Sequence, residues 1–296
     1  MPKGLVKGNI PSLLRPPPYL SNQCPTEGHA LHTCEEKMIV AGVDVGSVAA
    51  KSVVFDTAAQ AVIGKCVIPT GWNSAEAGEA ALQMACTQAK TSLDALSTIV
   101  GTGYGRVSLP FVTKSITEIT CHARGATWLF PQTGIVLDIG GQDSKVISLG
   151  SQGEVQDFVM NDKCAAGTGR FLQVLSGILE MPLDQLGKSA MQGTPVPISS
   201  MCAVFAETEI VGLLATGTPP HDVAAGVYLS IVKRMCALAK RIAPHGEWTF
   251  SGGLALSPAF CAMLSKELGA PVNVPENPQL LGALGAALIA GSLATA

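Results

Sequence analysis

Charged side chains are scarce in this sequence of 296 residues: they make up 14% of it, and the net charge is −3. Domains that bind nucleic acid usually carry a strong excess of positive charge, so the composition argues against nucleic acid as a partner. The longest apolar stretch, residues 280–294, is shorter than the roughly 20 residues that a membrane helix needs. Prolines interrupt the first 20 residues, where a signal peptide would be apolar. We therefore expect a cytoplasmic protein without a membrane span.

Aromatic side chains are also rare, at 5%, whereas glycine is frequent, with 32 residues. Hydrophobic residues amount to 47%, so most of the chain must fold around a core. The length is comfortable for two domains. Small residues favour tight turns and let the backbone approach a bound ligand closely.

Closely spaced cysteine pairs are absent. The nine cysteines are an odd number, and no two of them form a Cys-x-x-Cys motif. Because no secretory signal is present either, free thiols and a few metal ligands are expected in place of disulfides.

Residues 1–37 differ from the rest of the chain. They hold six of the nineteen prolines and show no helical or strand periodicity, so we expect a flexible extension. Four residues of this segment, Cys24, His29, His32 and Cys34, are of the types that bind zinc. Their spacing matches no familiar zinc module, and a mobile tail is the preferred interpretation.

From residue 38 onward, apolar runs typical of strands alternate with stretches of helical periodicity. Strands are expected at residues 38–43, 52–55, 97–101, 134–139, 145–149, 158–160 and 247–251, and helices at 74–92, 116–128, 165–180, 202–215, 222–242 and 278–293. This alternation predicts an α/β fold. We expect a first subdomain at residues 38–133, with a C-terminal helix at 278–296 packing back on it, and a second subdomain at 134–277.

One pattern occurs twice. The segment Asp44-Val-Gly-Ser-Val-Ala-Ala-Lys51 aligns with Asp138-Ile-Gly-Gly-Gln-Asp-Ser-Lys145, with Asp, Gly and Lys at the same offsets. Each copy joins two apolar strands and opens one half of the chain. The repetition predicts an internal duplication.

The residue types of this pattern indicate a site for phosphate and magnesium. Gly46 and Gly140 allow turn N–H groups to reach phosphate oxygens without a Cβ in the way. Asp44 and Asp138, at strand ends, are placed to hold Mg²⁺ directly or through water. Two such loops facing each other would grip a triphosphate, so we expect ATP as the ligand. The alternative, two ordinary hairpins with Asp-Gly turns, explains either copy alone but not the repetition.

Another glycine pair, Gly252-Gly253, follows the apolar run 247–251 and predicts a turn against which a base or ribose can lie. Other nucleotide motifs fail. Gly187-Lys188-Ser189 resembles the end of a P-loop, but Pro182 stands where that motif requires glycine.

The order of these loops resembles that of the superfamily of acetate and sugar kinases, Hsp70 and actin. The segments 101–106, 138–145, 161–172 and 200–207 are similar to motifs of one branch, the ATP-dependent activators of 2-hydroxyacyl-CoA dehydratases (BadF/BadG/BcrA/BcrD type), relatives of the ATPase subunits of benzoyl-CoA reductase. The resemblance covers about residues 38–293. It implies two duplicated RNase H-like subdomains of the actin/Hsp70 type with a nucleotide cleft between them.

The resemblance also implies a redox cofactor. Members of this family are homodimers that share one [4Fe–4S] cluster, and the positions that match their cluster ligands are Cys164 and Cys202. Each stands at the start of an expected helix, whose N-terminal end favours an anionic thiolate cluster. Outside its motif, Cys164 alone would be interpreted as a buried structural thiol. The family's function implies one-electron transfer to an acyl-CoA dehydratase or reductase, with ferredoxin or flavodoxin as the electron donor, in anaerobic metabolism.

The expected site residues follow from the loops and from this resemblance. Asp44 and Asp138 would organise Mg²⁺ and water, and Gln142 or Asp143 would orient the attacking water. The expected phosphate contacts are Gly46, Ser47, Lys51, Gly140, Gly141, Gln142 and Lys145, and the expected adenosine contacts are Glu207, Gly252 and Gly253. Lys51 and Lys145 are equally compatible with solvated strand residues.

Two other functions would use the same loops. A small-molecule kinase acting on a sugar or a carboxylate needs an acceptor site and has no use for Cys164 and Cys202. A chaperone-like binding module needs nucleotide but no redox group. The two cysteines within their motifs favour the activator.

Overall fold

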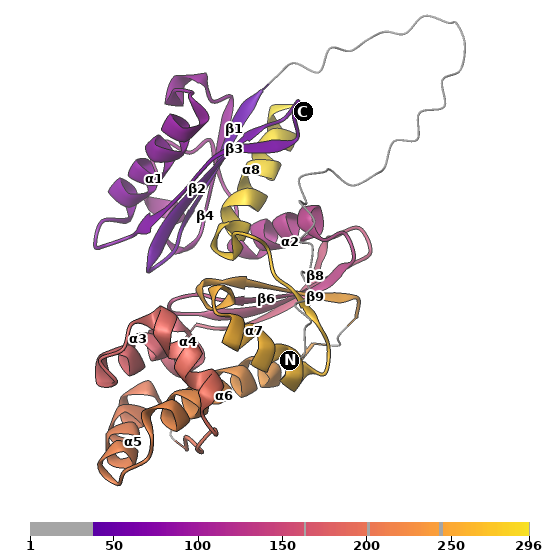
Figure 1. Ribbon diagram of the computed structural model, residues 1–296. Coiled ribbons are helices and arrows are strands. Elements are labelled where there is room, and N and C mark those ends of the chain that lie inside the picture. Colours follow the sequence, from indigo (N-terminus) through magenta and orange to yellow (C-terminus); the bar gives the residue numbers. More distant parts are fainter. Residues whose placement is uncertain (1–37, 163, 200–201, 243–244, 296) are drawn as a thin grey trace, which may run out of the picture. The chain divides into compact units, whose positions relative to one another are not determined.

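The computed structural model describes residues 38–162, 164–199, 202–242 and 245–295, and the account below is confined to them (Figure 1). The expected flexible extension, with Cys24, His29, His32 and Cys34, lies outside the described residues, as does the last residue of the expected C-terminal helix.

The first sheet has five strands in the order β3-β2-β1-β4-β5. These are β1 (Ile39–Val45), β2 (Ala49–Asp56), β3 (Ala61–Pro69), β4 (Thr98–Thr102) and β5 (Lys114–Ser115). The first three strands are antiparallel neighbours, whereas β4 runs parallel to β1 and β5 runs parallel to β4.

The second sheet repeats this topology. Its strands are β6 (Thr133–Ile139), β7 (Ser144–Leu149), β8 (Val155–Asn161), β9 (Glu247–Gly252) and β10 (Val272–Asn273). Their order, β8-β7-β6-β9-β10, again places three antiparallel strands before two parallel ones. The shared order confirms the α/β fold with two duplicated sheets.

Eight α-helices occur in the described part of the chain: α1 (Ser74–Ala89), α2 (Glu118–Leu129), α3 (Gly169–Ile178), α4 (Leu183–Gln192), α5 (Ala203–Ala215), α6 (Pro220–Ala239), α7 (Pro258–Leu268) and α8 (Leu281–Ala294). Short 3₁₀ helices are η1 (Leu93–Ala95), η2 (Tyr104–Ser108), η3 (Ala165–Gly167), η4 (Gly253–Leu256) and η5 (Pro278–Leu280). Among the described helices, none is long and apolar enough to cross a membrane.

The expectation of one helix over residues 165–180 is wrong. The segment forms η3 and then α3, because Thr168 between them has extended backbone angles (φ −136°, ψ 173°). Strand β3 and helices α4 and α7 were not predicted.

Helices cover both faces of the first sheet (Figure 1). Alternate residues of β1 point to opposite faces, and Ala41 and Val43 pack in the core formed with α1, whereas Val40 packs in the core formed with α8. At Gly42 the backbone of α8 approaches so closely that a Cβ would overlap the carbonyl oxygen of Ala283. The first sheet therefore owes one of its two covered faces to a helix from the far end of the described chain.

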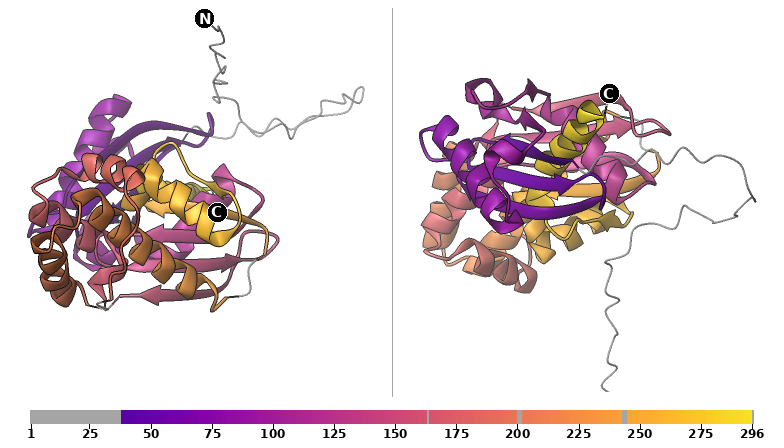
Figure 2. Two further views of the ribbon diagram at one scale, coloured as in Figure 1. Left: turned by 60° about the horizontal axis from the view of Figure 1, so that its bottom comes forward. Right: turned by 90° about the horizontal axis from the view of Figure 1, so that it is seen from above.

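Helices α2 and α8 pack against each other and extend the core toward the second sheet (Figure 2). Their backbones touch at glycines: a Cβ on Gly285 would overlap the carbonyl oxygen of Cys121, and Gly125 lies against Leu281. Ala126 of α2 shares a core with strand residues of β6 and β7. The opposite face of the second sheet packs on α3, α4, α6 and α7 in the largest core cluster.

Candidate active site

The two copies of the repeated pattern form equivalent hairpins. Asp44 lies directly opposite Lys51 across β1 and β2, and Asp138 lies directly opposite Lys145 across β6 and β7. The Lys51 Nζ is 3.0 Å from Asp44 Oδ2, and the Lys145 Nζ is 3.4 Å from Asp138 Oδ2. The separation of seven residues between Asp and Lys, which both copies share, is thus the spacing of a cross-strand pair on one face of a hairpin.

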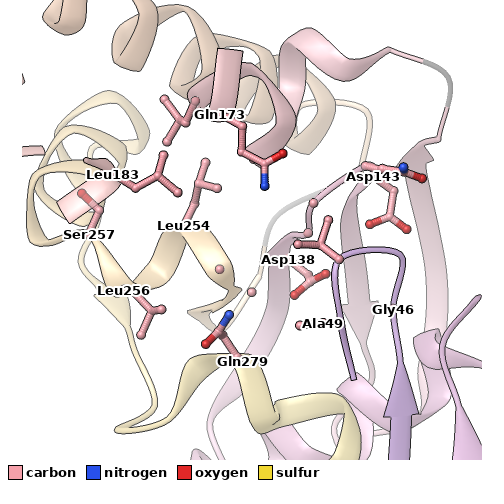
Figure 3. A pocket seen from close by; sticks show the side chains of 18 of the residues that line it. Gly46, Ala49, Asp138, Asp143, Gln173, Leu183, Leu254, Leu256, Ser257 and Gln279 are labelled. Carbon is pink, nitrogen blue, oxygen red and sulfur yellow. The ribbon is translucent and has the colours of Figure 1, made fainter. Parts of the chain in front are cut away.

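Both loops line one cavity of about 860 Å³ (Figure 3), a size within the usual range for nucleotide-sized ligands. The expected site residues that line it are Asp44, Gly46, Ser47, Lys51, Asp138, Gly140, Gly141, Gln142, Asp143, Lys145, Gly252 and Gly253. Two unrelated hairpins would not converge in this way. Glu207 is not among the lining residues: it lies exposed on α5.

Lys145 is one of the most deeply buried side chains of the site, with 2% of it exposed. Its Nζ lies 2.8 Å from Asp143 Oδ2, 3.4 Å from Asp138 Oδ2 and 3.4 Å from Glu118 Oε2. Burial opposes the charge, but the three carboxylates outweigh it and hold the pKa of Lys145 above its ordinary value. Lys145 is therefore a buried ion-pair centre, and the interpretation as a solvated strand residue does not apply to it.

Asp138 is held by three donors from three elements. Ser251 Oγ of β9 donates to Oδ1 at 2.8 Å, His122 Nε2 of α2 lies 3.3 Å from the same oxygen, and Lys145 faces Oδ2. Burial works against the charged form, but His122 and Lys145 outweigh it and keep the pKa of Asp138 well below its usual range. Asp138 is thus a fixed carboxylate anion at the edge of the cavity.

His122 and Glu118 also line the cavity, and neither was expected from the sequence. They lie one turn apart near the start of α2, whose N-terminus is capped by the Thr117 side chain. His122 and Asp138 are 16 residues apart in the chain, and Glu118 and Lys145 are 27 apart, so the helical pattern of residues 116–128 gave no signal for these contacts.

The other end of the cavity is more apolar. Figure 3 shows Leu183, Leu254 and Leu256 on the side away from Asp138 and Asp143. Gly187 and Lys188 of α4 line it as well, although they belong to a helix and not to a P-loop. This mixture of apolar walls and a few polar groups suits a nucleoside.

Gly252 and Gly253, at the end of β9, line the cavity between its polar end and its apolar end. Gly252 has φ +88°, a conformation that other residues rarely adopt, and a Cβ there would lie 2.9 Å from Asp138 Oδ1 and overlap the carbonyl oxygen of Ile139. The turn at the end of β9 therefore requires glycine for both its backbone angles and its closeness to the carboxylate.

The two cysteines expected to bind a cluster stand at helix starts. Cys202 is exposed and is the N-cap residue of α5, whereas Cys164 is half-buried and precedes η3. The Asn161 side chain brackets Cys164: its Nδ2 donates to the Cys164 carbonyl at 2.9 Å, and its Oδ1 accepts from the Cys164 N–H at 3.1 Å. Within the described residues, no group of three or more His, Cys, Asp or Glu side chains is arranged to hold a metal ion.

The loop between β6 and β7 (residues 140–143), the second copy of the repeated pattern, is joined by hydrogen bonds to the segment that follows Cys164. The N–H of Gly169 donates to the carbonyl of Gly140 at 2.9 Å, and the N–H of Arg170 donates to the carbonyl of Gly141 at 2.9 Å. The first backbone N–H groups of α3, which have no partner inside the helix, are thereby satisfied by the loop.

Comparison with known proteins identifies the family. The model of the BadF/BadG/BcrA/BcrD ATPase family matches residues 41–290. The activator of lactoyl-CoA dehydratase from Anaerotignum propionicum is 40% identical over 254 residues, which cover 86% of this chain and 97% of that protein.

Solved structures agree with this result. The (R)-2-hydroxyglutaryl-CoA dehydratase component A from Acidaminococcus fermentans has a TM-score of 0.83 at 36% identity, over 88% of this chain and 100% of that chain. The activator of the 2-hydroxyisocaproyl-CoA dehydratase from Clostridium difficile, with bound ADPNP, has a TM-score of 0.83 at 37% identity, over 87% and 96%. A ROK family glucokinase from Streptomyces griseus, with a TM-score of 0.54 at 12% identity, shares the fold alone. The expected actin/Hsp70-type architecture is confirmed.

Proposed function

We infer the function from one premise: the chain belongs to the BadF/BadG/BcrA/BcrD ATPase family and is an ATPase. We propose that it hydrolyses ATP in order to activate a 2-hydroxyacyl-CoA dehydratase or a related acyl-CoA reductase. In this proposal it acts as a homodimer that holds one [4Fe–4S] cluster between its two copies.

One observation carries the proposal: the hydrogen bonds from Gly169 and Arg170 to the carbonyls of Gly140 and Gly141. A shift of these two loop peptides when a γ-phosphate binds or leaves would be passed to the start of α3. Cys164 lies only five residues before Gly169 and is bracketed by Asn161 at the end of β8. The nucleotide site and the thiol are thus linked by a short, hydrogen-bonded path, which coupling between two sites requires.

The donor set fits half of a cluster site. An iron–sulfur cluster of this kind is held by four thiolates, and Cys164 and Cys202 both stand at the beginnings of helical segments. The N-terminus of α5 would favour the negative charge of a thiolate at Cys202. A second copy related by a twofold axis would supply the remaining two ligands.

Exposed apolar side chains next to Cys202 support the dimer. Val204 and Phe205, the second and third residues after it, are 70% and 71% exposed. A large apolar side chain exposed in the single chain, beside a ligand that needs a partner, is best explained by burial against the second copy.

In the nucleotide site we assign the chemistry to this chain's own residues. Asp44 and Asp138 hold Mg²⁺ and water, and the loop backbones at Gly46, Gly140 and Gly141 face the phosphates. Gln142 or Asp143 orients the attacking water. The bound cluster supplies one-electron transfer, with ferredoxin or flavodoxin as donor, and its sensitivity to oxygen fits a cytoplasmic role in anaerobic metabolism.

A small-molecule kinase is the second candidate, because the phosphate loops serve both functions. Transfer of phosphate by a kinase does not require the hydrogen-bonded connection between the phosphate loop and the segment that follows Cys164. It would also transfer phosphate to an acceptor, whereas the activator releases phosphate without one.

The test is purification without oxygen, followed by iron and acid-labile sulfide analysis. We expect a coloured dimer with about four iron atoms per two chains. Cys164→Ser should lose the iron and keep its affinity for ADP. Cys261→Ser, a change at a half-buried cysteine outside the two motifs, is the matched control and should keep both. A colourless wild-type dimer, or a Cys164→Ser protein that retains all its iron, would reject the cluster.

A further inference from the structure

His122 occupies the point where four elements of the site meet. It belongs to α2, its ring is buried with 8% of the side chain exposed, and it lines the nucleotide cavity. A Cβ on Gly282 of α8 would lie 2.9 Å from His122 Cε1 and 2.8 Å from Asp44 Oδ2. The ring is therefore enclosed by α8, by the end of β1 and by Asp138 at the end of β6.

The hydrogen-bond partners of the ring define its role. Nδ1 lies 2.8 Å from the backbone carbonyl of Glu118, which can only accept, so Nδ1 carries a hydrogen. Nε2 lies 3.3 Å from Asp138 Oδ1, which is an acceptor as well, so Nε2 also carries a hydrogen and the ring donates from both nitrogens. The first contact fixes the ring on its own helix, and the second directs the other nitrogen at the carboxylate.

The two repeated aspartates differ in this respect. Asp44 is paired with Lys51 of its own hairpin. Asp138 has the equivalent pair with Lys145 and, in addition, the contact to His122 and the hydrogen bond from Ser251. Both carboxylate oxygens of Asp138 are thus contacted, by side chains from β7, α2 and β9. Among the described hydrogen bonds and ion pairs, Asp44 is contacted only by the side chain of Lys51.

We propose that His122 is a positioning residue for ATP hydrolysis, which acts from α2 by holding the Asp138 carboxylate in the orientation in which it faces the cavity. The proposal rests on the role proposed above for Asp138, and it is independent of the cluster. A carboxylate that coordinates Mg²⁺ or its water loses part of its effect when it is free to turn. Residues that orient a metal ligand typically contribute about 10–100-fold to affinity or activity.

The test compares His122→Ala and His122→Gln with the wild type. Steady-state ATP hydrolysis gives kcat and KM, and calorimetric titration of ADP binding at increasing Mg²⁺ gives the half-saturating Mg²⁺ concentration. We expect His122→Ala to lower kcat by about 10–100-fold and to raise the half-saturating Mg²⁺ concentration by about tenfold. KM for ATP should change by less than about threefold, because the phosphate and nucleoside contacts remain. His122→Gln keeps an N–H donor and should recover part of both effects.

Cys121→Ala is the matched control, since Cys121 is the adjacent residue of α2 and is buried in the core shared with α8. It should leave kcat and the Mg²⁺ dependence near wild type. An equal decrease of kcat in His122→Ala, His122→Gln and Cys121→Ala would show that disturbance of α2, and not loss of the contact to Asp138, is responsible. That result would overturn the proposal. If His122→Ala fails to fold, His122→Gln and Ser251→Ala, which removes the other donor to Oδ1, provide the comparison.

Asp138→Asn separates this inference from the proposed function. If Asp138→Asn hydrolyses ATP at the wild-type rate with an unchanged Mg²⁺ dependence, the role of Asp138 fails and that of His122 fails with it. If Asp138→Asn is inactive while His122→Ala behaves as wild type, the role of His122 alone is rejected.

Discussion

Val48, in the loop between β1 and β2, packs directly on Gly141, in the loop between β6 and β7, so closely that a Cβ on Gly141 would overlap the Val48 Cγ2. The two loops of the duplicated pattern therefore touch. The approach of the two loops is limited at this point by one side chain and one glycine, and no room is left for even a methyl group.

Gly141→Ala should hold the two loops apart. The added methyl group must displace Val48, and displacing packed atoms costs about 1–3 kcal/mol. We expect ATP hydrolysis to fall by about tenfold or more, because a misplacement of about 1 Å in a catalytic site has effects of this size or larger. Comparing the rates of ATP hydrolysis by Gly141→Ala and the wild type at saturating ATP measures this decrease.

The contact itself can be tested by a second change. Val48→Gly in the Gly141→Ala background removes both Val48 carbons that the added methyl group would overlap, Cγ2 and Cβ, and should restore much of the rate. Gly177→Ala, a change in α3 where a Cβ meets nothing within 4 Å, should leave the rate unchanged. If the double variant is as slow as Gly141→Ala, the defect does not arise from Val48.

Lys145→Met should destabilise the fold far more than Lys51→Met. Lys145 is buried among three carboxylates, and its removal leaves these charges without their partner at a cost of about 3–5 kcal/mol. Lys51 has a single carboxylate partner in the described contacts, and 16% of its side chain is exposed, so a smaller loss is expected. Urea unfolding of both variants gives the free energies, and equal losses would contradict this ranking.

The buried thiols should resist alkylation well above neutral pH. Burial raises the pKa of Cys121 to about 12 and that of Cys236 to about 11. A raised thiol pKa keeps the neutral form, so at pH 8 only about one Cys236 in a thousand is ionised, against about one in ten at the ordinary value of 9.0. In metal-free native protein treated with iodoacetamide, mass spectrometry should find the exposed Cys202 modified first. Modification of Cys121 as fast as Cys202 would contradict the structure.

Asn161→Ala should weaken the proposed cluster without stopping hydrolysis. The variant loses both hydrogen bonds to the backbone of Cys164, so the thiol is less well oriented, and we expect iron to be lost about tenfold faster than from wild type. ATP hydrolysis should stay within about threefold, since Asn161 does not line the cavity. Asn161→Asp keeps the acceptor for the Cys164 N–H, so its rate of iron loss should lie between those of the wild type and Asn161→Ala. Iron loss is measured after anaerobic gel filtration into a chelator, and identical rates in all three proteins would exclude the bracket as a factor.

The two equivalent hairpins could be predicted because their signal is local and repeated. Asp44 with Lys51, and Asp138 with Lys145, stand at the spacing that a short hairpin imposes on a cross-strand pair. The strands that lead into the two loops read as mostly apolar runs: β6 is buried at every residue, and β1 at every residue except Ile39.

What the sequence did not indicate depends on long-range geometry or on weak local patterns. His122 looks like any residue of a helix until α2 is placed against Asp138. Strand β3 lies at the edge of its sheet, partly exposed and containing Gly64 and Lys65, so its apolar pattern is incomplete. The motif at residues 200–207 places Glu207 near the nucleoside, but α5 presents it on an exposed face, and it is not among the residues that line the cavity.

The packing of α8 also determines when the first sheet is completed during synthesis. Residues 281–294 leave the ribosome only after both sheets and all seven other described α-helices, yet they cover one face of strands that were made first. Contacts of such long sequence separation form late and slow folding. Until α8 arrives, Val40 and Val100 lack the α8 side chains that cover them, while Phe55 packs edge-on against Trp128 of α2, so the nascent first sheet presents an apolar surface of the kind that chaperones bind.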